Sequence, residues 1–231
     1  MTTENIWDKF AISYNNVLSK WSVYLELVSK ASIYLADSNF VLDQGCGTGI
    51  ISLELAKQGK RIIGIDNNPY MLGEAQNSLL LANKESNPKL NAVFMEGNAE
   101  HLIFRDGLFD GIVANNVIFY VDNPNQMISE TYRVLKEGGT FVVTGPKPNA
   151  DIERLCSQLH EEFRQKEIYE ELKEDIEHFL KCSFELKTTG IRNVYYPEEI
   201  AELLKKAGFS KDAEISDNIY LNQSFFVAVH K

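Results

Sequence analysis

Nine residues carry the strongest structural signal in this chain: Val41-Leu42-Asp43-Gln44-Gly45-Cys46-Gly47-Thr48-Gly49. The apolar run over 40–42 predicts a buried strand, and the alternating glycines after Asp43 predict a tight turn that a ligand can approach closely at the carboxyl edge of a sheet. A dinucleotide fingerprint would need its third glycine at position 50, which is Ile50, so the spacing argues against an NAD or FAD site. The competing interpretation is a plain turn with a glycine cap.

Beyond this loop, apolar runs alternate with segments of helical periodicity. Helices are expected over 4–36, 50–57, 69–83, 125–135 and 197–207, and strands over 40–42, 61–65, 92–95, 109–114, 140–144, 213–219 and 225–229. Asn67 or Asn68 is expected to cap the helix at Pro69, and Gly138-Gly139 to stop the helix over 125–135. This order predicts an α/β fold with a doubly wound, mostly parallel seven-stranded sheet, whose last two strands form an antiparallel pair.

Two helical segments fall outside the alternation. We therefore divide the chain into an N-terminal helical lid (1–36), a ligand-binding core (37–149), a helical cap insertion (150–190) and a C-terminal part of the core (191–231). Ligands of doubly wound folds bind beyond the carboxyl ends of the strands, and the loop after the fifth strand emerges there. The lid and the cap are therefore expected to cover the site together, and the acidic residues of the cap to form a solvated face.

Two acids stand at the ends of the first two strands. Asp66 lies 21 residues after Gly45, where doubly wound folds place an acid that binds ribose hydroxyls. The alternative is an Asx turn or a cap for the following helix. Asp43 stands at the entrance of the glycine loop and could receive the ammonium group of an amino acid.

The composition limits the partners. The 231 residues are 44% hydrophobic and 24% charged, with a net charge of −10 and a pI of about 5.0, which makes nucleic acid an improbable partner. No apolar run approaches the roughly 20 residues that span a bilayer, and MTTENIWDKF has no leader pattern. Cys46, Cys156 and Cys182 lack metal-ligand spacing and are expected to be reduced thiols in a cytoplasmic protein.

The glycine loop together with Ile62-Ile63-Gly64-Ile65-Asp66 resembles the first two motifs of class I S-adenosylmethionine (AdoMet) dependent methyltransferases. Later motifs of this family resemble two further stretches, Phe109-Asp110-Gly111-Ile112-Val113 and Val134-Leu135-Lys136-Glu137-Gly138-Gly139. A lid motif of the small-molecule branch, which includes ubiquinone and menaquinone methyltransferases, is similar to Trp7-Asp8-Lys9-Phe10-Ala11 with Tyr14. The resemblance implies AdoMet as the cofactor. The cofactor contacts it implies are Tyr14, Asp43, Gly45, Cys46, Gly47, Gly49, Asp66, Asn67, Asn98, Ala99 and Asn115.

The same resemblance implies a role for each group. The loop residues would line the methionine part, Asp66 the ribose, Asn67 the adenine face, Asn98-Ala99 the adenine edge and Asn115 the sulfonium end. The chain departs from the family at Asn98, where many relatives have Asp, and at Gln44, where an apolar residue is usual. A buried Gln44 needs a hydrogen-bond partner, and the sequence names none.

No catalytic residue is assigned from the sequence. Methyl transfer from a sulfonium needs a base only when the acceptor holds its proton, and positioning can supply most of the acceleration. Surface or supporting roles are expected for His101, His160, His178 and His230, and Tyr120, Tyr169, Tyr195 and Tyr196 could wall an acceptor pocket or belong to the core.

The acids show no metal triad, so no metal is expected, and Asn115-Asn116-Val117-Ile118 lacks the Asn/Asp-Pro-Pro-aromatic motif that base and amide methyltransferases often share. The sequence thus predicts an enzyme that methylates an O, N or C nucleophile of a small molecule. The alternatives are methylation of RNA or protein, or a regulatory module that binds AdoMet without catalysis.

Overall fold

The computed structural model describes residues 6–231, apart from the side chain of Asp217; residues 1–5 of the predicted lid lie outside the described residues. A single seven-stranded sheet forms the middle layer, in the order β3-β2-β1-β4-β5-β7-β6. β7 is antiparallel to both β5 and β6, and the other pairings are parallel. The strands are β1 (Phe40–Gln44), β2 (Arg61–Asp66), β3 (Ala92–Glu96), β4 (Phe109–Asn115), β5 (Leu135–Pro146), β6 (Glu214–Ile219) and β7 (Ser224–His230).

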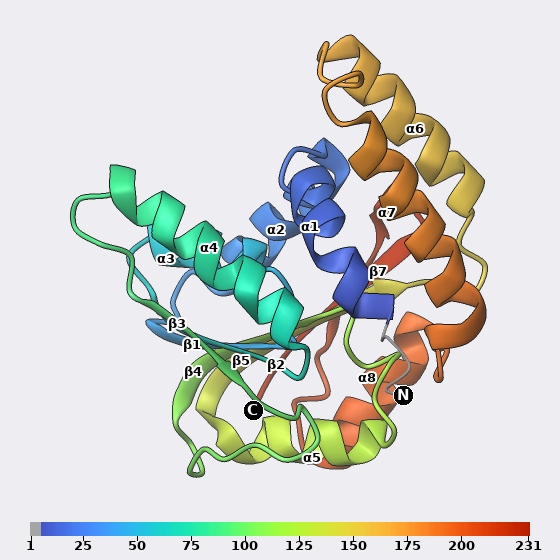
Figure 1. Ribbon diagram of the computed structural model, residues 1–231. Coiled ribbons are helices and arrows are strands. Elements are labelled where there is room, and N and C mark those ends of the chain that lie inside the picture. The colour runs from blue at the N-terminus through green and yellow to red at the C-terminus, as the bar shows by residue number, and fades with distance from the viewer. Residues whose placement is uncertain (1–5) are drawn as a thin grey trace, which may run out of the picture.

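Helices cover both faces of this sheet. Figure 1 shows α5 and α8 on one face and α1 to α4 on the other, with α6 and α7 standing beside α1. The helices are α1 (Ile6–Leu18), α2 (Ser22–Tyr34), α3 (Ile50–Lys57), α4 (Pro69–Glu85), α5 (Pro124–Val134), α6 (Ile152–Gln165), α7 (Lys173–Glu185) and α8 (Pro197–Ala207), and a π-helical turn, Leu186–Gly190, extends α7. The predicted doubly wound fold is confirmed.

Successive residues of the central strands point into different cores. Val41 belongs to the buried cluster that includes residues of α1 to α4, α6 and α7, whereas its neighbour Leu42 belongs to the cluster that includes residues of α5 and α8. In β7, Phe225 belongs to the same buried cluster as Leu42, and Phe226 belongs to the same cluster as Val41. Burial on both faces explains why these strands read as continuous apolar runs rather than as alternating patterns.

Two helix boundaries differ from the prediction. The helical pattern over 4–36 is broken into α1 and α2, because Trp21 takes an extended conformation and the buried carboxylate of Glu162, on α6, accepts hydrogen bonds from the backbone N (2.8 Å) and Oγ (2.6 Å) of Ser22 at the start of α2. The helix over 125–135 ends at Val134 rather than at Gly138-Gly139, because Leu135 already pairs with Phe109 in the sheet.

The three cysteines are free, as predicted, and Cys46 and Cys182 are buried. Among the helices of the described chain, none is both long enough and apolar enough to cross a membrane.

The sheet order creates a switch point between β1 and β4. The helix after β1 packs on one face of the sheet, through Ile51 and Leu55, and the helix after β4 packs on the other, through Met127 and Ile128. The chain therefore diverges at the carboxyl ends of these adjacent strands and leaves a crevice there, where doubly wound folds bind ligands.

Candidate active site

Two adjoining cavities open at this switch point. The smaller, of about 270 Å³, lies beyond the carboxyl ends of β1, β2 and β4. The larger, of about 360 Å³, lies between the end of β5 and the helices α1, α6 and α7. Both cavities are lined by Trp7, Tyr14, Asn116 and Tyr120. Two ligands bound in these cavities would therefore meet at those four side chains, which we call the junction.

Most of the predicted cofactor residues come together in the smaller cavity. Those that line it are Tyr14, Gly45, Gly47, Asp66, Asn67, Asn98, Ala99 and Asn115. Asp43, Cys46 and Gly49 do not line it: Asp43 is only 1% exposed and Cys46 is buried. Direct contact of these three residues with a cofactor remains a prediction.

Gly47 and Gly49 serve different purposes in the loop. Both have a left-handed backbone, with φ of +53° and +79°. A Cβ on Gly47 would have no atom within 4 Å and would stand in the cavity, whereas a Cβ on Gly49 would lie 2.7 Å from the ring of Phe94. Gly47 thus leaves room for a ligand, and Gly49 leaves room for the packing of β3 against α3.

Asp66 closes the loop from the neighbouring strand. Its Oδ2 accepts a hydrogen bond from Gly47 N at 2.9 Å, and its Oδ1 accepts one from Asn68 N at 2.9 Å. Burial raises the pKa of this carboxyl, and the backbone hydrogen bonds oppose that shift. Asp66 therefore forms an Asx turn and also lines the cavity. The helix α4 is capped by Asn68 instead, whose Oδ1 accepts hydrogen bonds from Tyr70 N and Met71 N.

Asp43 is a buried acid beneath the loop. Burial raises its pKa to about 7, the charge of Asp66 adds to this shift, and a 2.7 Å hydrogen bond from Ser52 Oγ opposes it. Two neighbouring carboxyls, one of which raises the pKa of the other, favour a cationic ligand nearby. This electrostatic preference, together with the open space at Gly47, fits the ammonium-bearing methionine part of AdoMet.

The departure at Gln44 is explained by two partners that the sequence does not reveal. Gln44 is fully buried; its Nε2 donates to Ala99 O at 2.8 Å, and its Oε1 accepts from Thr131 Oγ1 at 2.8 Å. The side chain ties β1 to α5 and to the Asn98-Ala99 segment. It therefore holds the predicted adenine edge in place.

A second polar group fixes the end of β4. Thr144 Oγ1 donates to Asn115 Oδ1, and Asn115 Nδ2 donates to Tyr24 OH at 3.3 Å, so the amide is fully oriented. Tyr24 also shares a hydrogen bond with Tyr14. The next residue, Asn116, has a φ of +58°, an uncommon conformation outside glycine that Asn tolerates. This turn brings Asn116 to the junction.

The larger cavity is mostly apolar and is built from segments distant in the sequence. α1, α6 and α7 contribute Phe10, Leu18, Leu155, Leu159 and Phe179, and the tip of the β6–β7 hairpin contributes Tyr220. None of the four histidines lines either cavity, and of the tyrosines predicted as pocket walls only Tyr120 does so. Sequence reasoning missed Asn116 and Tyr220, and no local pattern marks Tyr220.

Comparison with known proteins agrees with the methyltransferase motifs of the sequence. Residues 42–143 match the family described as "Methyltransferase domain". An uncharacterised protein of Methanocaldococcus jannaschii is 26% identical over 98% of this chain and 88% of its own length. The mitochondrial ubiquinone biosynthesis O-methyltransferase of Dictyostelium discoideum is 31% identical over 58% of this chain, which spans only 43% of that protein.

Among solved structures, the magnesium protoporphyrin IX methyltransferase of Synechocystis, with bound S-adenosylhomocysteine, matches with a TM-score of 0.61 and 18% identity over 91% of this chain and 84% of that one. At this identity the match shows the fold. Together, the family match over residues 42–143 and this shared fold agree with the class I AdoMet-dependent methyltransferase that the motifs predict. AdoMet is the cofactor that these similarities indicate.

Proposed function

We propose that this chain transfers a methyl group to an O, N or C nucleophile of a small molecule held in the larger cavity. The observation that carries this proposal is the contact of the two cavities at Trp7, Tyr14, Asn116 and Tyr120. A mostly apolar space of about 360 Å³, roofed by helices, suits a small organic acceptor better than a polymer. The net charge of −10 adds a reason against RNA.

Bound AdoMet supplies an electrophilic methyl group. The residues proposed to hold it are those of the smaller cavity, with Asp66 on the ribose hydroxyls, Asn98 and Ala99 at the adenine edge, and Gly47 allowing close backbone approach. The acceptor is held between the junction and the apolar walls. The chain then contributes orientation and exclusion of water, which suffice for an in-line displacement.

The junction tyrosines are not suited to act as bases. Burial raises the pKa of Tyr120 to about 12, and burial together with Tyr120 raises the pKa of Tyr14 still further. Both side chains therefore stay neutral near pH 7 and can donate hydrogen bonds. Since no histidine reaches either cavity, the acceptor is expected to bind with its nucleophilic lone pair already available.

The helices 6–36 and 150–190 are proposed to act together as a lid. Glu162 links α6 to α2 through its hydrogen bonds with Ser22. Burial alone would raise the pKa of Glu162, but hydrogen bonds from Lys166, Ser22 and Gln158 outweigh burial and lower this pKa to about 2. Phe10, Val17 and Leu18 of α1 are buried in the core, so the lid is packed rather than loose over part of its length.

Hydrogen exchange tests the lid. Exchange in α1, α6 and α7 is expected to slow on addition of S-adenosylhomocysteine, since closing segments are held less firmly than the core without ligand. The core strand β4 serves as the internal control, with exchange unchanged. Equal protection of these helices with and without ligand would make them ordinary structural packing.

Turnover tests the function. The protein is incubated with AdoMet and a panel of small phenols, carboxylic acids and amines, and formation of S-adenosylhomocysteine is measured, with a bulk RNA and a protein extract as comparison acceptors. Turnover with a small molecule supports the proposal. Turnover with RNA or protein alone refutes the proposed acceptor class, and tight AdoMet binding without any turnover supports a binding module.

The compartment stays a prediction. The free cysteines suit a reducing environment, and we propose the cytoplasm on that basis. Fractionation of cells with an antibody against the chain would test it.

A further inference from the structure

The charged side chains among the described residues that line the larger cavity are all of one sign. Within residues 6–231, Asp217 aside, this lining contains two lysines, Lys147 and Lys187, and no Asp, Glu or His. This is notable in a chain with 33 acidic and 23 basic residues. The remainder of the lining is mainly aliphatic and aromatic, with a few neutral polar groups such as Asn116, Ser183 and Gln223. The cavity therefore combines an apolar wall with a positive charge.

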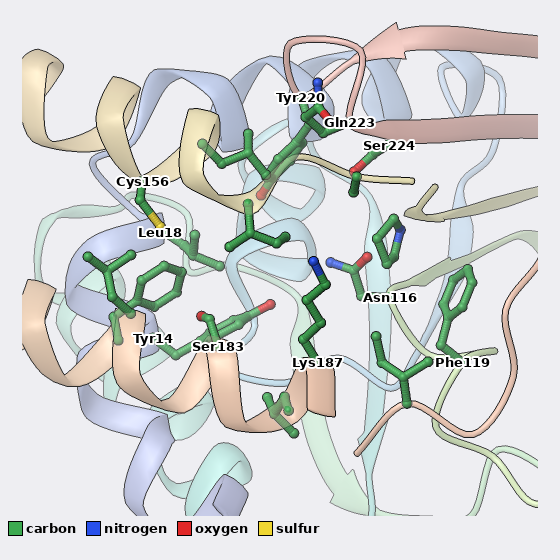
Figure 2. Close-up of a pocket in the computed structure, with 18 of the residues that line it drawn as sticks. Tyr14, Leu18, Asn116, Phe119, Cys156, Ser183, Lys187, Tyr220, Gln223 and Ser224 are labelled. Carbon is green, nitrogen blue, oxygen red and sulfur yellow. The ribbon is translucent and has the colours of Figure 1, made fainter. Parts of the chain in front are cut away.

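Lys187 is the more informative of the two lysines. It lies on the π-helical turn that extends α7, and such turns are frequent at functional sites. Figure 2 shows its side chain extending into the cavity in the direction of Asn116, which belongs to the junction. Within the described part of the chain, the Lys187 ammonium has neither a hydrogen bond nor an ion pair. A positive charge without a protein partner thus faces the space reserved for the acceptor.

We propose that the larger cavity takes an apolar molecule that bears an anionic oxygen group, such as a carboxylate or a phenolate, and that Lys187 selects this ligand by pairing with its anionic oxygen. This inference rests on the proposed function and specifies its acceptor class. An apolar body buries itself against Phe10, Leu159 and Phe179, while the anion reaches Lys187 beside the junction.

The physical basis is the desolvation of the ammonium group. Lys187 is exposed without a ligand, and a ligand that fills the cavity displaces water from the side of Lys187 that faces the cavity. A neutral ligand leaves that loss of hydration without compensation. An anionic ligand supplies a charge-assisted hydrogen bond in its place. An ionised oxygen at the junction would also be consistent with a site that brings no base to the acceptor. Lys187 is therefore a specificity-determining residue in this proposal, rather than a catalytic one.

The two tryptophans of the chain, Trp7 and Trp21, both line the cavity, so intrinsic fluorescence reports on its occupancy. We suggest titrating the protein, saturated with S-adenosylhomocysteine, with octanoate and with the neutral isostere octanamide. Neither probe absorbs where tryptophan is excited. Octanoate is expected to bind at least tenfold more tightly than octanamide, and raising the salt concentration to weaken octanoate alone.

Variants separate the charge from general packing. Lys187→Met should remove the preference for octanoate while octanamide binds as before, and Lys187→Arg should retain it. Lys181→Met, on the helix α7 that leads into this turn but outside the lining, is the matched control and should behave as the wild type. Equal binding of both probes to the wild type, binding of neither, or an unchanged preference in Lys187→Met would overturn the inference.

Calorimetry of S-adenosylhomocysteine binding to the same proteins keeps the two proposals apart. Normal cofactor binding with no preference for octanoate contradicts only the role of Lys187. Failure of the wild type to bind S-adenosylhomocysteine contradicts the proposed function itself.

Discussion

Replacing Gly47 and Gly49 by alanine, one at a time, should separate ligand binding from folding. Both positions have a left-handed backbone, in which a side chain costs about 1–2 kcal/mol. At Gly47 the added methyl meets no protein atom within 4 Å, so that strain is the whole expected loss of stability. At Gly49 the methyl would also displace the ring of Phe94, which brings the loss to about 2–5 kcal/mol.

The losses of AdoMet affinity should rank the two variants in the reverse order. The Gly47→Ala methyl projects into the smaller cavity, where it would occupy space needed by AdoMet, so affinity is expected to fall at least tenfold, or about 1.4 kcal/mol. Gly49→Ala points away from that cavity and should lose little affinity in the protein that folds. Urea unfolding without ligand measures the first quantity and titration calorimetry with AdoMet the second. A Gly47→Ala protein that binds as tightly as the wild type, or a larger affinity loss in Gly49→Ala, would refute the placement of the cofactor.

Three further outcomes are expected. Asp66→Ala should weaken AdoMet binding at least tenfold, about 1.4 kcal/mol, and unchanged affinity in an intact fold would remove Asp66 from the site. Because burial raises the pKa of Asp43 from 3.8 to about 7, the folded protein keeps a proton that the unfolded chain releases in that window. The free energy of unfolding without ligand should thus fall as the pH rises from about 4 to 7, by up to about 1.4 kcal/mol per pH unit. Asp43→Asn should flatten that slope. An equal slope in both proteins would contradict the raised pKa of Asp43. For Glu162, whose pKa is lowered to about 2, the stabilisation is present above its unfolded pKa of about 4.5 and is lost as the pH falls toward 2. Glu162→Ala should therefore cost about 2 kcal/mol in urea unfolding at pH 7, whereas the exposed neighbour Glu161→Ala should stay within about 0.5 kcal/mol, and similar losses in both would argue against the anchoring role.

The sheet could be predicted because its signals are local. Runs such as 62–65 are apolar throughout because side chains on both faces of the strand pack into a core. The glycine loop after the first of these strands has few alternative uses. The positions of Gly45, Gly47 and Asp66 in one cavity follow from the rule that the carboxyl ends of parallel strands meet at one edge.

What the sequence could not reveal depends on contacts between distant segments. The break between α1 and α2 is stabilised by Glu162, which lies more than a hundred residues away, and no local pattern announces it. Gln44 is satisfied by Ala99 and Thr131 through the same kind of long-range contact. Lys187 looks like one of many charges on an acidic helical segment, and only the packing of α7 over the cavity sets it apart.

A crystal structure of the protein grown with S-adenosylhomocysteine is the most direct test of the two-cavity arrangement. We expect the adenosyl group in the smaller cavity, its ribose hydroxyls at Asp66, and its sulfur facing the junction formed by Trp7, Tyr14, Asn116 and Tyr120. The larger cavity should remain open on the other side of the sulfur. Density for the ligand in the larger cavity, or a sulfur directed away from the junction, would contradict methyl transfer between these two sites.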